Sequence, residues 1–386
     1  MQTRWGAVFS LWFAGLCAAG QFSKIGVIFP ELATLWPGAG ARLGLVVSVV
    51  GVVGVIFGTT AGLMVARLGA RRLIIGALIA GAAISALQCL HLPLGVMIAS
   101  RVVEGFAHLA IVVAGPVLIA GAATPRDQAA AMTLWSTFFA LAFTITAVLG
   151  LPLAQSQGAI ALWAVHAVLM VLAATLLGRV LPPEAPRPPA PRMQLRALLA
   201  DTRAIYADPH IAAPAMGFVF YTLIFVAALT LVPGLVAPQF RALTASVMPL
   251  VSIASSLGFG VMLTRRLGAV RVAQIGFVGG ALSALVWGLA TGVGQVGAAL
   301  LISACLGLVQ GASFAAIPEL NSTPDARAKA AGAVAQLGNV GTTLGTPILL
   351  ALAAALGPVA LTLFALPLCL GGIAMHGWLR ARRARF

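Results

Sequence analysis

The most regular feature of this sequence is a succession of long apolar runs separated by short polar segments. Each run has about 20 residues, which is the length that a helix needs to cross the ~30 Å hydrocarbon core of a bilayer. A bilayer offers no water to exposed backbone groups, so runs of this kind fold as helices. The pattern predicts twelve transmembrane helices, over residues 6–30, 43–66, 73–91, 94–119, 129–153, 159–178, 211–233, 243–264, 272–290, 296–316, 331–356 and 358–379.

A longer polar segment separates the sixth run from the seventh. It contains Leu181-Pro-Pro-Glu-Ala-Pro-Arg-Pro-Pro-Ala-Pro-Arg192, a composition typical of extended linkers, followed by a short amphipathic stretch. Six runs precede this segment and six follow it. We therefore predict an N-terminal six-helix bundle over residues 1–178, a cytoplasmic Pro/Arg-rich linker over 179–210, and a C-terminal six-helix bundle with a basic cytoplasmic tail over 211–386.

Composition indicates an all-α membrane protein. The chain is 61% hydrophobic and 8% charged, whereas soluble domains have ~25% charged residues. The cysteines Cys17, Cys89, Cys305 and Cys369 all lie in apolar runs without C-x-x-C spacing, so we expect neither a disulfide framework nor a metal site. The first run continues to Pro30, which is too long for the apolar region of a signal peptide. It is better interpreted as the first membrane span.

Basic residues are concentrated in alternate connecting segments. Nineteen of the 23 Lys and Arg residues fall on the side that carries both termini, so the positive-inside rule predicts that both termini are cytoplasmic. The net charge of +15 is then a consequence of topology, and we expect contacts with membrane lipids and no nucleic-acid partner. Arginine outnumbers lysine 21 to 2, as in GC-rich bacterial genomes, which favours a bacterial inner membrane.

Three ionisable residues interrupt the apolar run over residues 94–119. Arg101, Glu104 and His108 are spaced at i, i+3 and i+7, so a helix places them on one face. An ionised group in hydrocarbon costs at least ~2.5 kcal/mol, so this face is expected to point toward protein or a water-filled cavity. One interpretation is a buried Arg101–Glu104 ion pair that holds helices together. The other is a functional site, which we favour because buried ion pairs are poor stabilisers compared with apolar packing.

The two halves of the chain repeat each other. Arg67-Leu-Gly-Ala recurs 199 residues later as Arg266-Leu-Gly-Ala, and Thr124-Pro125 recurs as Thr323-Pro324 at the same offset. Arg42 and Arg241 form a further matching pair. Matches spread over several loops indicate two homologous halves. Parallel repeats of this kind are typical of alternating-access carriers, in which the binding site lies between the halves near the midplane.

The segment from Gly62 to Arg72 reads Gly-Leu-Met-Val-Ala-Arg-Leu-Gly-Ala-Arg-Arg. It resembles the G-x-L-A-D-R-x-G-R-K signature of the major facilitator superfamily, and Arg101 with Gly105 resembles the family's helix 4 motif R-x-x-q-G. The resemblance covers the whole chain and implies a twelve-helix transporter whose helices 1, 4, 7 and 10 line a central cavity. It also implies a gating motif formed by Gly62, Arg67, Gly69 and Arg72, with Arg266 and Gly268 in the second half.

Two positions depart from the family pattern. The aspartate of the signature is Ala66 here, and the matching position of the second half holds Arg265. In the family this acid helps to latch the cytoplasmic side when the carrier opens outward, so we expect the outward-open state to be less favoured than in relatives. The antiporter signature of helix 5, G-x-x-x-G-P-x-x-G-G, is reduced to Gly150-Leu151-Pro152. This weakens an assignment as a drug/proton antiporter but leaves export open.

Two cations are predicted at similar depth in the cavity that the resemblance implies. At ~1.5 Å per residue, Lys24 lies ~9 Å from the outer end of helix 1 and Arg101 lies ~10 Å from that of helix 4. Lys24 has an alternative role, in which it extends outward to the membrane interface. With Glu104 ionised, the three charges sum to +1, and a positive centre of arginine and lysine favours a carboxylate or phosphate. We therefore predict a small organic anion or zwitterion as substrate.

Burial raises the pKa of a carboxylic acid, and a neighbouring cation lowers it. A carboxylic acid under both influences can exchange a proton when its surroundings change. Glu104 is therefore the predicted proton-coupling residue. Tyr221, Gln21, Gln310 and His108 are further candidates for substrate contact, although glutamines in membrane helices more often bond neighbouring helices.

Three other functions compete with this interpretation. A polyspecific drug or metabolite/proton antiporter is the main alternative, but it favours an aromatic, acidic cavity over a basic one. An enzyme is not expected, because the chain lacks H-E-x-x-H and G-x-S-x-G motifs, and we predict no catalytic residue and no cofactor. A sensor that uses a carrier fold without transport remains open. We expect a monomer.

Overall fold

The computed structural model describes residues 2–39, 42–184 and 195–385. Within these ranges the chain is helical throughout, without strands. The helices of the first part are α1 (Trp5–Gly26), α2 (Phe29–Leu35), α3 (Leu43–Leu68), α4 (Ala70–Gln88), α5 (Leu94–Ala122), α6 (Gln128–Ser136), α7 (Phe138–Ile145), a π turn (Thr146–Gly150), α8 (Leu151–Gln157) and α9 (Ala159–Val180). Helix α10 (Leu195–Ala207) follows. The second part has α11 (Pro209–Leu235), α12 (Arg241–Ser255), a π turn (Ser256–Gly260), α13 (Val261–Leu267), α14 (Ala269–Leu289), α15 (Val293–Leu320), α16 (Pro324–Leu356) and α17 (Ala360–Arg383).

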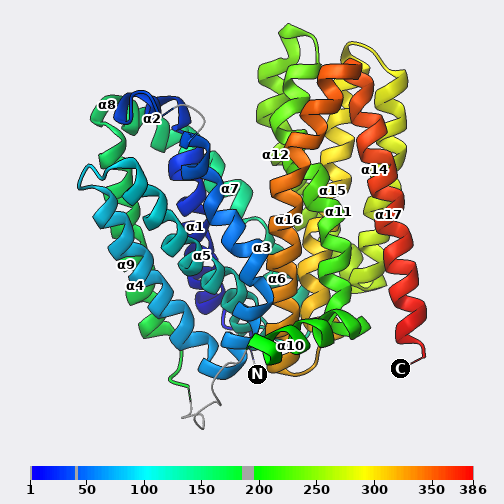
Figure 1. The fold of residues 1–386 in the computed structure, drawn as a ribbon. Coiled ribbons are helices and arrows are strands. Elements are labelled where there is room, and N and C mark those ends of the chain that lie inside the picture. Colours follow the sequence, from blue (N-terminus) through cyan, green and yellow to red (C-terminus); the bar gives the residue numbers. More distant parts are fainter. Residues whose placement is uncertain (1, 40–41, 185–194, 386) are drawn as a thin grey trace.

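Eleven segments of the described chain are long and apolar enough to cross a membrane. The last of them, Pro324–Arg383, has 60 residues and contains the two helices α16 and α17, which lie side by side in Figure 1. They are separated at Gly357, whose φ of 62° lies in the left-handed region that glycine adopts readily. The described residues therefore contain the twelve membrane helices that the apolar runs predicted.

Figure 1 shows the helices in two bundles, one containing α1–α9 and the other α11–α17. Glycines let the helices approach each other closely, as is common in membrane proteins. A Cβ atom added at Gly276 of α14 would lie 2.7 Å from the carbonyl oxygen of Cys305 on α15. The predicted linker lies partly outside the described residues, and its amphipathic stretch forms α10.

The two bundles contact each other along α3 and α16. Gly58 and Gly62 of α3 lie against Gln336 and Ala328 of α16, so that even a methyl group at Gly62 would come within 2.6 Å of the Ala328 carbonyl oxygen. Gln336 Nε2 also donates a hydrogen bond of 2.8 Å to the carbonyl oxygen of Val55 on α3. At these glycines α3 lies directly against the backbone of α16, and the Gln336 side chain adds a hydrogen bond between the bundles.

One end of the molecule carries both termini and α10, and we call it the linker end (Figure 1). The bundles meet there and diverge toward the opposite end. Helix α10 bonds to both of them, because Thr202 lies 3.1 Å from Thr59 on α3 and Tyr206 donates a 2.7 Å hydrogen bond to Gln336 on α16. Asp127 and Arg265, 3.5 Å apart, form a further link between the bundles. The conformation is therefore closed at the linker end.

Candidate functional site

The ionisable residues of α1 and α5 meet inside the first bundle. Lys24 Nζ lies 2.7 Å from Glu104 Oε1, and Arg101 Nη1 pairs with Glu104 Oε2. Their side chains are at most 1% exposed. We call Lys24, Arg101 and Glu104 the charge cluster. One carboxylate thus forms ion pairs with two cations. Lys24 points into the bundle rather than outward to the membrane interface.

The local sequence of α5 explains how this arrangement forms. Arg101 and Glu104 are separated by three residues, which places them on one face of the helix. Gly105 beside them allows α3 to approach, because a Cβ atom there would lie 2.9 Å from the Val53 side chain. This close approach brings the Val46 carbonyl oxygen within 2.9 Å of Arg101 Nε, which donates to it. The guanidinium is therefore held between α3 and α5.

Neutral polar residues of α4 surround the charge cluster. Lys24 Nζ donates hydrogen bonds of 2.7 Å to both Ser85 Oγ and Gln88 Oε1. The amide nitrogen of Gln88 donates to Glu104 Oε2 at 2.9 Å and to Ser100 Oγ at 3.1 Å. These bonds satisfy charged groups that burial has removed from water.

A histidine of α9 extends the network. His166 Nδ1 lies 2.8 Å from Ser85 Oγ, and His166 Nε2 lies 2.9 Å from the carbonyl oxygen of Cys17. A carbonyl oxygen can only accept a hydrogen bond, so Nε2 carries a hydrogen and is the donor. Ser85 accepts from Lys24 and donates to Nδ1 of the neutral imidazole. Lys24 is thereby connected to His166 through one hydroxyl group.

The charge cluster has an excess of positive charge. Two cations and one carboxylate sum to +1, and in the described part of the chain Arg101 Nη2 is buried without a hydrogen-bond partner. An unpaired buried donor on a cation is energetically unfavourable. An oxygen of an anion would satisfy both the unpaired donor and the excess charge.

Two of the predicted contact residues lie in the first bundle outside the charge cluster. His108 Nδ1 donates to the Ala18 carbonyl oxygen at 2.9 Å, and its ring packs edge-on against Phe22 with centroids 4.8 Å apart. Gln21 is fully buried, and its amide atoms have no hydrogen-bond partner among the described residues. The helical spacing of His108 therefore places it on the same face as Arg101 without a direct contact.

The other two predicted contact residues lie elsewhere. Tyr221 of α11 stacks between Phe218 and Phe225, with ring centroids 5.1 and 5.0 Å apart. Gln310 of α15 donates to the carbonyl oxygen of Ser136 on α6, which makes it a bond between the bundles. In this conformation the side chains predicted on helices 1, 4, 7 and 10 do not form a single site.

Ser85, Gln88 and His166 were not predicted from the sequence. A signal was present, because His166 is an ionisable residue inside an apolar run, and such residues mark functional positions. Ser85 and Gln88 share one face of a helix at i and i+3. Neutral polar residues are common between membrane helices, however, so spacing alone could not distinguish these two from ordinary helix contacts.

The gating motif forms equivalent turns in the two bundles. Gly69 and Gly268 have φ values of 97° and 82°, a region that disfavours other residues. After each glycine, a carboxylate accepts from the start of the next helix: Glu184 from the Arg71 amide at 3.1 Å, and Glu319 from the Ala269 amide at 2.8 Å. The carboxylates satisfy amide groups that lack helical partners.

The remaining motif residues have different surroundings. Gly62 packs directly against α16, as described above. Arg67 lies 3.9 Å from Asp201 of α10. Arg72 and Arg266 are exposed at the linker end.

The fold and the repeated turns define a membrane transporter of two similar six-helix bundles. The family model of the Major Facilitator Superfamily matches residues 11–323, and the chain belongs to this family. A search of curated proteins found no match.

Solved structures of transporters share the fold. The human organic anion transporter MFSD10 (TETRAN) is 15% identical, with a TM-score of 0.76 over 96% of this chain and 99% of that one. FucP in the outward conformation, a fucose:proton symporter of E. coli, is 14% identical, with a TM-score of 0.76 over 97% and 98%. The proton:xylose symporter XylE, bound to 6-bromo-6-deoxy-D-glucose, is 14% identical, with a TM-score of 0.75 over 98% and 95%.

Proposed function

We propose that this protein is a secondary active transporter that moves a small organic anion or zwitterion across a bacterial inner membrane by alternating access. Glu104 couples transport to protons. The observation that carries the proposal is the charge cluster, with its excess positive charge and the unpaired Arg101 Nη2 atom. The fold is compatible with several substrates, since its solved relatives include an organic anion transporter and sugar:proton symporters.

Charge balance suggests how substrate and proton are linked. With Glu104 ionised, the charge cluster carries +1. When Glu104 takes up a proton, its ion pairs with Lys24 and Arg101 are lost. The net charge of the charge cluster then rises to +2. A bound monoanion returns it to +1. Exchange of the Glu104 charge for a substrate charge therefore keeps the buried net charge constant, which avoids the large penalty of an additional uncompensated charge.

The conformation supports an outward-facing assignment. The positive-inside rule predicts that the linker end faces the cytoplasm, and the bundles are closed at that end. Similarity to FucP in the outward conformation agrees with this assignment. Arg101 is 0% exposed, so access of substrate to its guanidinium requires the packing of α3 against α5 to loosen during the cycle.

The first test is a thermal-shift screen of purified protein against anionic, zwitterionic and cationic metabolites. A ligand that binds only the folded protein raises its melting temperature. We expect an organic anion or zwitterion to stabilise the wild type and to have no effect on Arg101→Ala. Arg241→Ala is the matched control, because Arg241 is exposed at the start of α12, and this variant should respond like the wild type.

Two results would contradict the proposal. If only lipophilic cations stabilise the protein, and Arg101→Ala responds equally, the polyspecific antiporter becomes the better assignment and the charge cluster is a structural ion pair. If the stabilising anion is not transported into proteoliposomes, the protein is a sensor with a carrier fold.

A further inference from the structure

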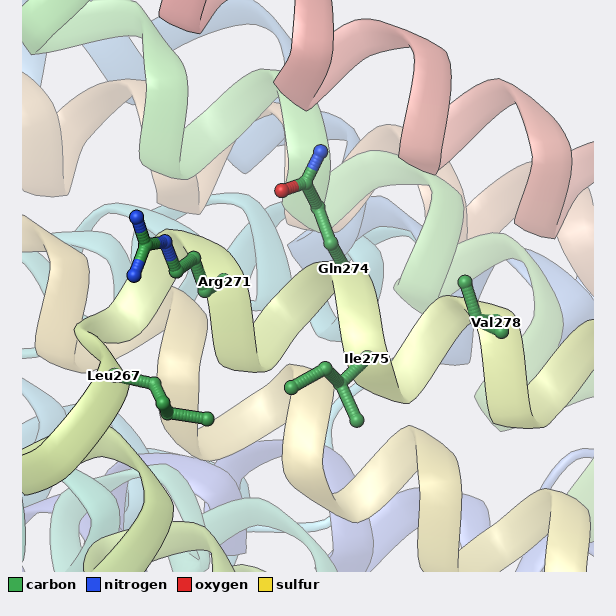
Figure 2. A pocket seen from close by; sticks show the side chains of 5 residues that line it. All are labelled: Leu267, Arg271, Gln274, Ile275 and Val278. Carbon is green, nitrogen blue, oxygen red and sulfur yellow. The ribbon is translucent and has the colours of Figure 1, made fainter.

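A groove of about 420 Å³ lies on the second bundle near the linker end of α14 (Figure 2). Its α14 residues are spaced at i, i+3, i+4 and i+7, which places them on one side of the helix. Ile275 and Val278 are 44% and 45% exposed, so the groove opens outward from the bundle. The lining residues are Leu267, Arg271, Gln274, Ile275 and Val278.

The end of the groove nearest the linker end is positively charged. Arg271 is exposed, and it has no hydrogen-bond or ion-pair partner among the residues that the structure describes. Arg266, near the end of the preceding helix α13, is a second exposed cation. Glu319 lies beside Gly268 and accepts a hydrogen bond from the Ala269 amide at 2.8 Å, so this carboxylate is bound to the helix start rather than to either arginine.

The rest of the groove continues as an apolar stripe along α14. Ile275, Val278 and Leu282 follow Arg271 at helical spacing, and Leu282 is 59% exposed. The eleven helical steps from Arg271 to Leu282 cover ~16 Å of helix. This length matches one leaflet, which is half of the ~30 Å hydrocarbon core. The surface therefore has a cationic end followed by an apolar stripe, and its length matches that of one lipid molecule.

We propose that this groove binds an anionic glycerophospholipid of the cytoplasmic leaflet. The phosphate pairs with the guanidinium of Arg271, whose planar group can bond two oxygens at once. An acyl chain lies along Ile275, Val278 and Leu282. The site rests on the proposed orientation of the linker end toward the cytoplasm, but it does not depend on the substrate or on proton coupling.

The test is thermal unfolding of the detergent-purified protein, titrated with phosphatidylglycerol or phosphatidylcholine. We expect phosphatidylglycerol to raise the melting temperature more than phosphatidylcholine does. In Arg271→Gln, the phosphatidylglycerol concentration that gives half of this rise should increase about fivefold, the effect of one basic residue at a lipid surface. Val278→Trp, which fills the groove and keeps the charge, should weaken the response as well.

Arg72→Gln is the matched control, because Arg72 lies 199 residues earlier at the equivalent place in the repeat, also exposed. It should keep the wild-type response. The proposal is overturned if Arg271→Gln and Val278→Trp respond to phosphatidylglycerol like the wild type. It is also overturned if the response of Arg72→Gln is weakened as much as that of Arg271→Gln. Equal stabilisation by phosphatidylcholine or by inorganic phosphate would also overturn it.

Discussion

At the scale of single residues, Glu104 determines the electrostatics of the first bundle. Its two oxygens pair with Lys24 and Arg101, and it also accepts a hydrogen bond from Gln88. Two buried cations therefore depend on one carboxylate. Removal of one member of a buried ion pair is strongly destabilising, because the remaining charge stays buried without compensation.

We expect Glu104→Gln to lower the stability of the purified protein by about 3 kcal/mol, the lower end of the range for broken buried pairs. Thermal unfolding measures this loss. Glu31→Gln provides the control, since among the described residues Glu31 forms no ion pair and its carboxylate accepts one exposed hydrogen bond, from Gln155 at 3.2 Å. If Glu104→Gln and Glu31→Gln melt alike, the charge cluster contributes no stability.

The same variant tests proton coupling. Substitution by glutamine fixes the neutral form of the side chain, so we expect transport by Glu104→Gln in proteoliposomes to lose its dependence on a pH gradient. Substrate exchange in the absence of a gradient should persist. Gradient-driven uptake equal to that of the wild type would rule out Glu104 as the coupling residue.

At the scale of elements, the contact of α3 with α16 controls closure at the linker end. Gly62 allows the closest approach, since a Cβ atom there would also lie 3.3 Å from Gly332 on α16. A larger side chain would force the two helices apart only in the closed state. The glycine of the gating motif therefore has a steric role that follows from the packing.

We expect Gly62→Val to shift the population toward a state that is open at the linker end. Overpacking typically costs ~1–3 kcal/mol, which corresponds to a roughly 5- to 150-fold change in the ratio of states. Distances between spin labels on the linker ends of α3 and α16 measure the shift. Gly44→Val is the control in the same helix, because no atom lies within 4 Å of its added Cβ. Equal label distances in both variants would contradict the prediction.

Helix α10 also stabilises the closed conformation at the linker end. Burial raises the pKa of the Tyr206 phenol, so the group stays protonated and donates to Gln336, which in turn donates to Val55 of α3. One hydrogen bond thus joins the linker to the contact between the bundles.

We expect Tyr206→Phe to weaken closure by ~1 kcal/mol, or about fivefold in the ratio of states, because it removes one hydrogen bond and keeps the ring. The spin-label distances used for Gly62→Val detect this change. Thr175→Val serves as the control, since Thr175 is an exposed residue that bonds only its own helix. No change in Tyr206→Phe relative to Thr175→Val would show that the Tyr206–Gln336 hydrogen bond does not stabilise the closed state.

At the scale of the whole molecule, closure occurs with Ala66 in the place of the family's aspartate. The glycine contact, the Asp127–Arg265 pair and α10 hold the linker end together in this chain. Because Gly58 faces Gln336 and Gly62 faces Ala328, position 66, one turn farther along α3, lies toward the start of α16. The expectation that the outward-open state is less favoured than in relatives stays a prediction.

We expect Ala66→Asp to increase the outward-open population by up to about fivefold, because a carboxylate near a helix start contributes ~0.3–1 kcal/mol. Ala66→Asn has similar size without the charge and should have a smaller effect. Spin-label distances across the linker end measure both. The idea of a missing latch is wrong if the two variants behave alike.

The sequence alone determined the number of membrane helices, their division into two bundles and the family. The number of helices follows from the transfer of each apolar run into hydrocarbon, which depends on composition and hardly on neighbours. The division follows from the polar linker and the repeated motifs, and the family from the motif between Gly62 and Arg72. The pairing of Arg101 with Glu104 was also predictable, because helical geometry fixes it within one segment.

Only the tertiary structure decided which side chains join that pair. Ser85, Gln88 and His166 reach the charge cluster, while His108, Tyr221 and Gln310 bond elsewhere. Such contacts depend on the rotation of each helix about its axis and on close approach at glycines such as Gly105 and Gly62. Closure at the linker end was decided in the same way, because it comes from contacts between residues far apart in the chain, which the periodicity of a single segment does not encode.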